Sequence, residues 1–326
     1  MKKQSLGIGF IGAGEISILH ARALKEIPEA HLVGLWNRTE PRAIERAREE
    51  KCKRYATPQE LVDDPEVDAV LVLTNLETHL QYAEMVMRAG KDVLVEKPLC
   101  ATVADVEKMK QIATETGKLC MPGHNMIHEE SLKRARTLIA NGDLGSIVSC
   151  YVMYNIYHSD ERASTLPGVV RHLLTHHLYT MMYLVGRPVR AQGFKANRNH
   201  AQQPDKEDLT MVNLELANGA LAHLCASFAA DDLAPAPWTF TARVIGTAGT
   251  THYTYNDWVE VKKGISHSHT YTAYQATITN EVRHFVELCR NRAGEPPSTL
   301  DDAIWAQKTT EAIEKSIAEG LSVEIR

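Results

Sequence analysis

The sequence predicts an α/β protein: an N-terminal doubly wound parallel sheet, then a C-terminal α+β domain with a large, mostly antiparallel open sheet. Over the first third of the chain, continuous apolar strands alternate with amphipathic helices, a pattern typical of a parallel sheet covered on both faces. Beyond about residue 125 the strands lengthen and alternate apolar with polar residues, as antiparallel strands do. Since 326 residues suit two domains, we expect one over residues 1–123 and a second over 124–326.

Each element of the first domain is predicted from its local pattern. Short runs of apolar, often β-branched residues indicate buried strands, expected at Leu6–Gly12, Ala30–Trp36, Ala69–Leu73, Asp92–Val95 and Leu119–Met121. The segments between them carry helical periodicity, with helices expected at Ser17–Glu26, Glu40–Lys51, Pro58–Asp63, Thr78–Ala89 and Ala104–Thr116. Gly90 directly after the fourth helix is typical of a helix C-cap. Right-handed crossovers between these strands give the doubly wound topology.

The second domain is predicted from alternating strands and four helices. The strands are expected at Ile147–Tyr157, Val189–Asn197, Asp208–Glu215, Ala220–Ala229, Thr239–Gly246 and Gly249–Tyr255. Asn218-Gly219 between the third and fourth of these favours a tight hairpin. The helices are expected at Glu129–Asn141, His172–Val185, Ala276–Arg292 and Leu300–Glu319. Together they indicate one antiparallel-rich sheet with helices on one face.

Composition excludes several classes of protein. The net charge of −5 and a pI near 6.3 argue against nucleic-acid binding, which needs a basic surface. No apolar run is long enough to span a membrane, and the N-terminal residues do not resemble a signal peptide. None of the six cysteines lies in a CxxC pair. We therefore expect a cytoplasmic protein with reduced, mostly buried thiols.

A glycine-rich turn after the first strand predicts a dinucleotide site. Gly12 permits the tight turn, and Gly14 lets a pyrophosphate approach the backbone. The helix that follows offers free N–H groups and the positive end of its dipole, and we expect Glu15 and Ile16 also to contact the cofactor. Ser17, at the third glycine position of the GxGxxG pattern, is still small enough for close packing. The alternative is a glycine turn that binds no ligand.

The end of the second strand bears on the choice between NAD and NADP. An acidic residue usually binds the adenosine ribose of NAD at this point, whereas this chain has Asn37-Arg38. Asn37 can bind a ribose hydroxyl without repelling a phosphate, and Arg38 can pair with a 2′-phosphate or stack on adenine. We therefore expect NAD or NADP as cofactor. The alternative for Arg38 is an exposed surface charge.

Residues able to transfer protons follow two of the strands and occupy one helix. Lys97 lies just beyond a parallel strand, where ligands of open α/β sheets bind. A lysine near a cationic or apolar surface has a lowered pKa and can exchange a proton with a substrate hydroxyl. The segment Thr74–His79 follows another strand. His172 and His176, four residues apart, are expected on one face of one helix.

These motifs resemble the Gfo/Idh/MocA family, named for glucose–fructose oxidoreductase and inositol dehydrogenase, over essentially the whole chain. The resemblance is carried by Gly12-Ala13-Gly14, Thr74–His79, Glu96-Lys97-Pro98, and His176 ten residues before Gly186. It implies a Rossmann dinucleotide domain, a catalytic role for Lys97, and a match of His176 to the histidine of the family's Asp-x-x-x-His helix. It also implies contact with the cofactor or the pocket floor by Thr74, Asn75, His79, Glu96 and Asn125. For Asn125 the alternative is a turn formed with Gly123.

The chain departs from the family pattern at two positions. The family's Thr-Pro pair is Thr74-Asn75 here, and the aspartate of Asp-x-x-x-His is replaced by His172. Neutral His172 can accept or relay a proton, but it cannot supply a fixed negative charge. The pH optimum and the reaction direction that are usual for alcohol dehydrogenases of the family are therefore not carried over to this chain.

The sequence thus predicts hydride transfer between NAD(P) and a secondary alcohol or ketone of a sugar, polyol or related cyclic compound. Lys97, helped by His176 and His172, is expected to remove the hydroxyl proton. Sugar sites need many donors and acceptors, and we expect substrate contacts from Lys97, Asn125, Tyr154, His158, Arg171, His172 and His176. The exposed face of the C-terminal sheet is expected to assemble a homodimer or homotetramer.

Three alternatives remain open at this point. The first is a glycosidase or lyase whose NAD is recycled within each turnover, as in some relatives. The second is a dinucleotide sensor without catalytic activity. The third is a metal site formed by His158, His172, His176 and His177, although no zinc-protease motif accompanies them and we expect no bound metal. For His177, which lies off the face of its neighbours, we expect a role in the core.

Overall fold

The computed structural model describes residues 5–200, 206–231, 240–254, 260–261, 264–265 and 268–326. Within it the chain divides into two compact units. The first comprises Met1–His128 and Gln275–Ile304, and the second comprises Glu129–Tyr274 and Trp305–Arg326. We expected a single boundary between residues 123 and 124. The structure differs because residues 275–304 also belong to the first unit.

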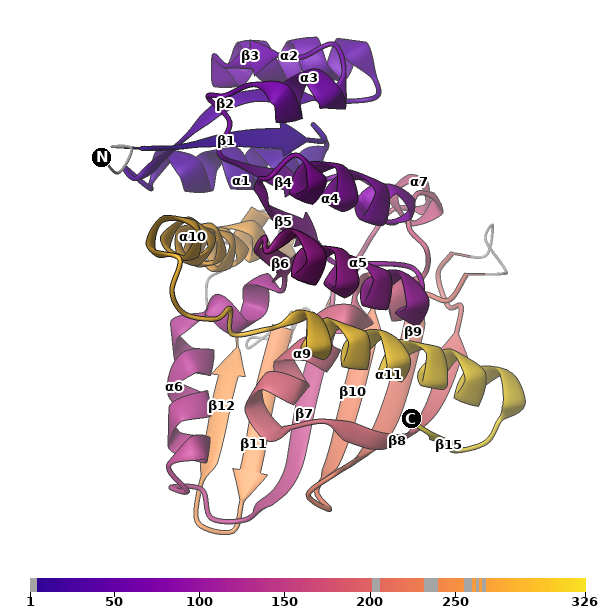
Figure 1. Ribbon diagram of the computed structural model, residues 1–326. Coiled ribbons are helices and arrows are strands. Elements are labelled where there is room, and N and C mark those ends of the chain that lie inside the picture. Colours follow the sequence, from indigo (N-terminus) through magenta and orange to yellow (C-terminus); the bar gives the residue numbers. More distant parts are fainter. Residues whose placement is uncertain (1–4, 201–205, 232–239, 255–259, 262–263, 266–267) are drawn as a thin grey trace. The chain divides into compact units, whose positions relative to one another are not determined.

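The first unit contains a parallel sheet of six strands in the order β3-β2-β1-β4-β5-β6 (Figure 1). The strands are β1 Leu6–Ile11, β2 Ala30–Trp36, β3 Lys53–Arg54, β4 Ala69–Val72, β5 Asp92–Glu96 and β6 Cys120–Gly123. The order reverses between β1 and β4, which is the switch point where open α/β sheets bind their ligands. The doubly wound parallel sheet predicted from the sequence is confirmed, and the two-residue edge strand β3 was not predicted.

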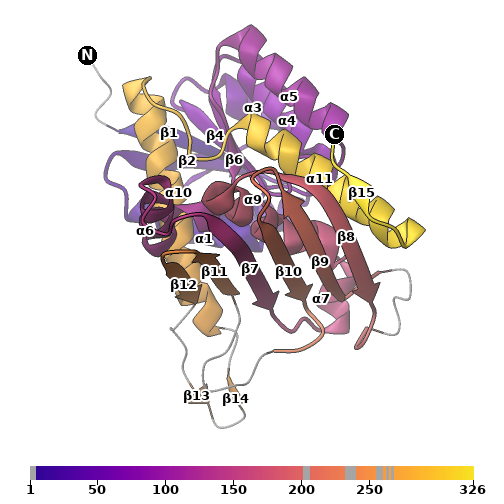
Figure 2. The same ribbon diagram turned by 90° about the horizontal axis from the view of Figure 1, so that it is seen from below.

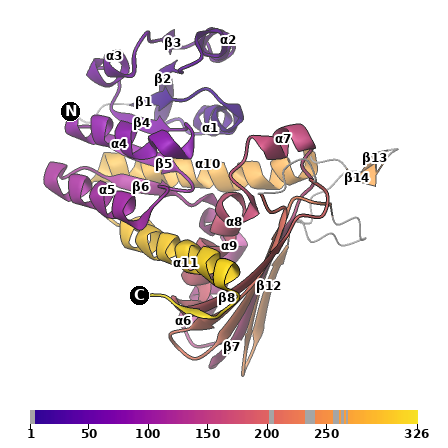
Figure 3. The same ribbon diagram turned by 90° about the vertical axis from the view of Figure 1, so that its right-hand side faces the viewer.

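Helices cover both faces of this sheet. They are α1 Glu15–Lys25, α2 Glu40–Glu50, α3 Pro58–Asp63, α4 His79–Arg88, α5 Val103–Thr116 and the first-unit part of α10 Ser268–Asn291, with the short 3-10 turns η1 Leu76–Thr78 and η2 Asn125–His128. The helices α3, α4 and α5 pack on one face through a core that includes Val70, Val95, Met87 and Met109. The helices α1 and α10 lie on the other face (Figure 3). Gln275 Nε2 of α10 donates a 2.9 Å hydrogen bond to the Leu19 carbonyl of α1.

The second unit contains a sheet of seven strands in the order β12-β11-β7-β10-β9-β8-β15. The strands are β7 Ile147–Asn155, β8 Pro188–Ala196, β9 Leu209–Leu216, β10 Leu221–Ser227, β11 Phe240–Gly246, β12 Thr250–Thr254 and β15 Val323–Glu324. All neighbours are antiparallel except β7 and β10, which confirms the mostly antiparallel sheet. Asn218-Gly219 makes the expected hairpin, since Gly219 has a φ of +83°. A separate pair is formed by β13 Glu260–Val261 and β14 Gly264–Ile265.

The helices of the second unit are α6 Glu130–Ala140, α7 Asp160–Ser164, α8 Val169–His172, α9 Leu174–Val185 and most of α11 Leu300–Glu319. The helices α9 and α11 cover one face of the sheet (Figure 2). That face carries the buried alternate side chains of the strands, for example Val212 and Leu214 of β9. Among the described helices, none combines the length and the apolarity that crossing a bilayer requires.

Two helices differ clearly from those expected. The helix expected at His172–Val185 is interrupted at Leu173, so His172 ends α8 and His176 lies in α9; the prediction that both lie on one helix was wrong. The helix α10 begins at Ser268 rather than Ala276. The outer ends of two expected strands, Thr239 and Tyr255, lie outside the described residues.

Candidate functional site

The glycine turn after β1 separates two roles for its glycines. Gly12 has a φ of +116°, and a Cβ on it would lie 2.5 Å from the Leu73 carbonyl oxygen, so the protein itself requires glycine there. Gly14 has a φ of −72° and begins α1, and a Cβ on it would meet no protein atom within 4 Å. The open space at Gly14 lies at the positive end of a helix dipole, where a pyrophosphate fits.

The third position of the turn is filled by a small buried side chain. Ser17 is fully buried, and its hydroxyl donates a 2.6 Å hydrogen bond to the Gly14 carbonyl. The backbone N–H groups of Glu15 and Ile16 lie in the first turn of α1, which has no side-chain cap. The turn therefore fits the phosphates of a dinucleotide, as the sequence predicts.

At the end of β2, Asn37 and Arg38 differ in how they are engaged. Asn37 Oδ1 accepts a 3.0 Å hydrogen bond from the Ala13 N–H, and its Nδ2 donates to the Thr39 carbonyl. Asn37 thus braces the glycine turn from the neighbouring strand. Arg38 is exposed. Burial raises the pKa of Tyr82 of α4, and the charge of Arg38 lowers it.

At the end of β5, Glu96 and Lys97 have different environments. The Glu96 carboxylate is buried, with Oε1 2.9 Å from His20 Nε2, and its Oε2 accepts from the Lys97 N–H at 3.0 Å. Burial alone would raise the pKa of Glu96, but the hydrogen bond and charge of His20, followed by the charge of Lys97, lower it. Lys97 is half-buried. The Glu96 carboxylate therefore holds the backbone N–H of Lys97 and places a negative charge next to this residue.

The segment after β4 is tied to the segment after β5 by His79. Its ring Nδ1 lies 3.0 Å from the Pro98 carbonyl oxygen, and its Nε2 lies 3.0 Å from that of Thr74. Burial lowers the pKa of His79, against the effect of these hydrogen bonds. Thr74 is half-buried and Asn75 is exposed. Since β1, β4 and β5 are neighbours, their carboxyl ends bring Gly14, Thr74, Asn75 and Lys97 to one sheet edge.

Beyond β6, two side chains bond to residues of the later segment 275–304 of the first unit. Asn125 is buried, and its Nδ2 donates a 2.6 Å hydrogen bond to Thr277 Oγ1 of α10. His124 Nδ1 lies 2.6 Å from Ser298 Oγ. Burial lowers the pKa of His124 to about 4. This part of the edge is thus closed by residues 152 and 174 positions away in the sequence, which local motifs do not reveal.

In the second unit, His176 lies in a cluster of aromatic rings. It is buried, and its Nδ1 is 2.6 Å from the Tyr179 hydroxyl one helical turn away. The rings of Tyr154, Tyr179 and Tyr274 meet it edge-on, with centroids 6.0, 5.6 and 6.1 Å away. Tyr179 was not among the predicted site residues, although its spacing of three residues from His176 is a helix-face signal.

The other residues expected to bind substrate are distributed differently. His172 and His158 are half-buried, and their ring centroids are 6.3 Å apart. Arg171 instead makes a two-pronged ion pair with Glu314 of α11, with distances of 2.6 and 2.8 Å. Its planar guanidinium is therefore engaged in joining α8 to α11.

His177 behaves as the core residue that was expected. It is fully buried, with Nδ1 3.0 Å from the Leu173 carbonyl oxygen and Nε2 2.9 Å from that of Cys225. Burial lowers its pKa to about 4, so the ring is neutral near pH 7. Across the described part of the chain, no three His, Cys, Asp or Glu side chains are grouped to hold a metal ion.

Comparison with known proteins gives two family models that match successive parts of the chain. The oxidoreductase family with an NAD-binding Rossmann fold matches residues 6–124. The GFO/IDH/MocA C-terminal domain matches residues 132–252. The two models correspond to the dinucleotide turn with its sheet edge and to the sheet that carries β7 to β12.

Similar proteins include several dehydrogenases. A myo-inositol 2-dehydrogenase of Thermotoga maritima is 36% identical over 141 residues, 42% of each chain. A scyllo-inositol 2-dehydrogenase (NAD(+)) of Bacillus subtilis is 26% identical over 97% of this chain and 95% of its own. The solved structure of GenD2 from gentamicin A biosynthesis, in complex with NAD, has a TM-score of 0.88 at 24% identity, over 100% of this chain and 98% of that one.

Proposed function

The chain belongs to the GFO/IDH/MocA family of NAD(P)-binding oxidoreductases, and on that premise we propose that it transfers hydride between NAD(P) and a secondary alcohol or ketone of a sugar, polyol or related cyclic compound. The observation that carries the proposal is the edge of the first sheet. There the open space at Gly14 and the half-buried Lys97 follow β1 and β5, two strands separated only by β4. The inositol dehydrogenases among the relatives support the substrate class.

We assign the cofactor to the turn after β1 and the segment after β2. Gly12, Gly14, Glu15 and Ile16 would hold the pyrophosphate, and Asn37 with Arg38 would border the adenosine ribose. Thr74, Asn75, His79, Glu96, Lys97 and Asn125 would border the nicotinamide half, with His79 and Glu96 acting through the backbone that they hold. When bound, the nicotinamide supplies the hydride chemistry. Since Arg38 is exposed and no carboxylate stands at Asn37, a 2′-phosphate is accepted, and we propose NADP alongside NAD.

We assign proton transfer to Lys97, with His176 and His172. Lys97 would accept the proton of the substrate hydroxyl during oxidation and return it during reduction. If the Tyr179 hydroxyl accepts a hydrogen bond from Nδ1–H of His176, then Nε2 of that ring is left as a proton acceptor. Tyr154, His158 and Asn125 complete the proposed substrate contacts. Arg171 contributes by holding α8, since its guanidinium is paired with Glu314.

Replacing the lysine tests this assignment. Lys97→Ala should lower kcat by roughly 10²- to 10⁴-fold in a polyol and sugar screen with NAD and NADP, followed by nicotinamide absorbance. Dinucleotide affinity should change little, because the phosphate turn is intact. The matched control is Lys108→Ala, since Lys108 is exposed on α5. Unchanged turnover in Lys97→Ala contradicts the assignment, and product formed without net change in absorbance favours internally recycled NAD.

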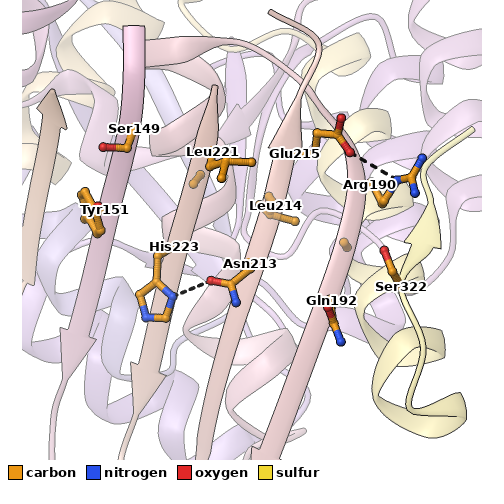
Figure 4. A pocket seen from close by; sticks show the side chains of 12 residues that line it. Ser149, Tyr151, Arg190, Gln192, Asn213, Leu214, Glu215, Leu221, His223 and Ser322 are labelled. Atoms are coloured by element: carbon orange, nitrogen blue, oxygen red, sulfur yellow. Dashed lines mark hydrogen bonds and ion pairs between the residues drawn. The ribbon is translucent and has the colours of Figure 1, made fainter. Parts of the chain in front are cut away.

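We also propose that a second copy of the chain covers the outer face of the second sheet. Tyr151, Phe194, Met211 and Leu221 on that face are between 37% and 66% exposed. A hollow of about 420 Å³ lies among β7, β10, β9 and β8, where Tyr151 and Leu221 stand beside the bonded pairs His223–Asn213 and Arg190–Glu215 (Figure 4). Apolar side chains beside paired polar ones are typical of oligomer interfaces.

Light scattering tests the assembly. Leu221→Glu should reduce the mass of a homodimer or homotetramer, because it places a charge on the apolar part of the face. Leu138→Glu, on an exposed position of α6, is the matched control and should leave the mass unchanged. A wild-type protein that is monomeric at micromolar concentration contradicts this proposal.

We further propose that the chain works in the cytoplasm. All six cysteines are free, and five of them are buried. Free thiols are typical of cytoplasmic proteins, because the cytoplasm keeps thiols reduced.

A further inference from the structure

Glu281 of α10 is a buried acid that the proposed mechanism does not use. Its side chain is fully buried, and neither carboxyl oxygen has a hydrogen-bond partner in the described part of the chain. An unpaired carboxylate is costly in such a place, whereas a carboxylic acid is tolerated. Burial, followed by the negative charge of Glu96, raises the pKa of Glu281 well above its usual range, and the charge of Lys97 acts in the opposite direction.

The packing of α10 places Glu281 near the end of β5. Thr277, four residues before Glu281 and on the same helix face, accepts the hydrogen bond from Asn125. Asn125 follows β6, and the strand register sets Gly123 of β6 beside Glu96 of β5. Asn280, next to Glu281, donates a 3.2 Å hydrogen bond to the His128 carbonyl. The face of α10 that carries Glu281 is therefore turned towards the segment that contains Glu96 and Lys97.

Two charged groups act on this carboxyl, those of Glu96 and Lys97. The titratable groups on the neighbouring elements include Glu96 at the end of β5, Lys97 directly after it, His20 on α1, His124 and His128 around η2, Asp302 of α11 near His124, and His284 on α10 itself. Glu96 is already bonded to His20 and to the Lys97 N–H. His124 is neutral near pH 7, because burial lowers its pKa to about 4. The positive charge of the Lys97 ammonium lowers the pKa of Glu281.

We propose that Glu281 is a positioning residue whose buried carboxyl is coupled to the protonation of Lys97. When Lys97 is an ammonium, it favours the carboxylate of Glu281. By the reciprocity of linked equilibria, that carboxylate favours the ammonium. Glu281 thereby adjusts how readily Lys97 holds a proton without contacting the substrate. The inference rests on the role proposed above for Lys97.

Infrared titration of the whole protein tests the coupling without any turnover. The C=O stretch of protonated Glu281 is identified by its loss in Glu281→Gln, an isostere of the neutral acid, and by its persistence in Glu287→Gln. Glu287 is exposed on the same helix and serves as the matched control. In Lys97→Met the Glu281 signal should persist to higher pH, by about one unit or more, because a neighbouring positive charge is gone. If Glu281→Gln fails to fold, Glu281→Asp identifies the signal by its shifted frequency.

The kinetic readout separates positioning from a merely structural role. In Glu281→Gln the limb of the kcat/KM profile that reports Lys97 should move to lower pH, since the amine loses the group that stabilises its charged form. The inference is overturned if the midpoint of the Glu281 infrared titration is the same in wild type and Lys97→Met. It is also overturned if Glu281→Gln retains every protonated-carboxyl signal of the wild type. If Lys97→Ala is fully active while the infrared midpoint is displaced in Lys97→Met, the proposed function is overturned and the coupling is retained.

Discussion

Asn37 and His79 at the edge of the first sheet differ from His176 in the histidine segment of the second unit in the kind of hydrogen-bond partner they have. At the sheet edge, Asn37 and His79 bond to backbone groups of neighbouring loops. In α9, His176 bonds to a side-chain hydroxyl among aromatic rings. A side chain bonded to backbone fixes a loop, whereas one bonded to a hydroxyl can still change its proton arrangement. Residue type therefore marks a site, but the partner of each side chain decides its role.

The largest expected effect concerns the two glycines of the first region. Gly12→Ala should lower the free energy of unfolding by about 4 kcal/mol, because its Cβ would meet the Leu73 carbonyl at a positive φ. Gly14→Ala should cost no more than about 1 kcal/mol as a changed helix cap, yet weaken dinucleotide binding. Urea unfolding and titration calorimetry measure the two effects. Equal losses of stability in both variants would break the distinction between a glycine required by packing and one required by a ligand.

The next effect compares two buried histidines, one from each region. Burial lowers the pKa of both His124 and His177 to about 4 from 6.5. Between these values the unfolded chain binds more protons than the native one, so stability rises with pH and is lost as the pH falls from 6.5 towards 4. The loss is about 3 kcal/mol for each histidine across the whole window.

Urea unfolding at several pH values checks this prediction. His177→Gln, which cannot take up a proton, should reduce the acid sensitivity by one histidine's share and leave that of His124. If the pH dependence is unchanged, His177 is not a neutral core residue in the native protein. His124 and His177 would then differ in their protonation.

Much of this arrangement was predictable, and the reason is physical. Glycine turns, parallel strands and the Lys97 motif depend on residues close together in sequence, so their patterns predict them. The partners that define roles come from far away: Cys225 for His177, Glu314 for Arg171 and Thr277 for Asn125. The break at Leu173 and the strand β3 of two residues are likewise too short to leave a periodic pattern in the sequence, so they could not be predicted.

A smaller effect is expected for the histidine that ties two loops. His79→Leu removes its contacts with the Thr74 and Pro98 carbonyls, and it should cost about 2 kcal/mol of stability. Turnover should fall as well, because the segments after β4 and β5 are no longer joined. His31→Leu, at an exposed position of β2, is the matched control and should change stability by less than about 0.5 kcal/mol. A fully stable and active His79→Leu would mean that backbone bonding does not mark a positioning role.

The smallest effect tests the second region alone. Tyr179→Phe keeps the ring beside His176 but removes the hydroxyl 2.6 Å from Nδ1. We expect kcat to fall about tenfold, equivalent to about 1.4 kcal/mol, and the pH profile to move, because the ring loses the partner that selects its tautomer. Tyr183→Phe on the same helix, beside Arg136, should leave both unchanged. Since neither replacement opens a cavity, equal thermal stability of the two variants separates lost proton positioning from lost packing. A normal kcat and pH profile in Tyr179→Phe would show that His176 does not depend on its side-chain partner, and the contrast with the backbone-bonded Asn37 and His79 would then no longer hold.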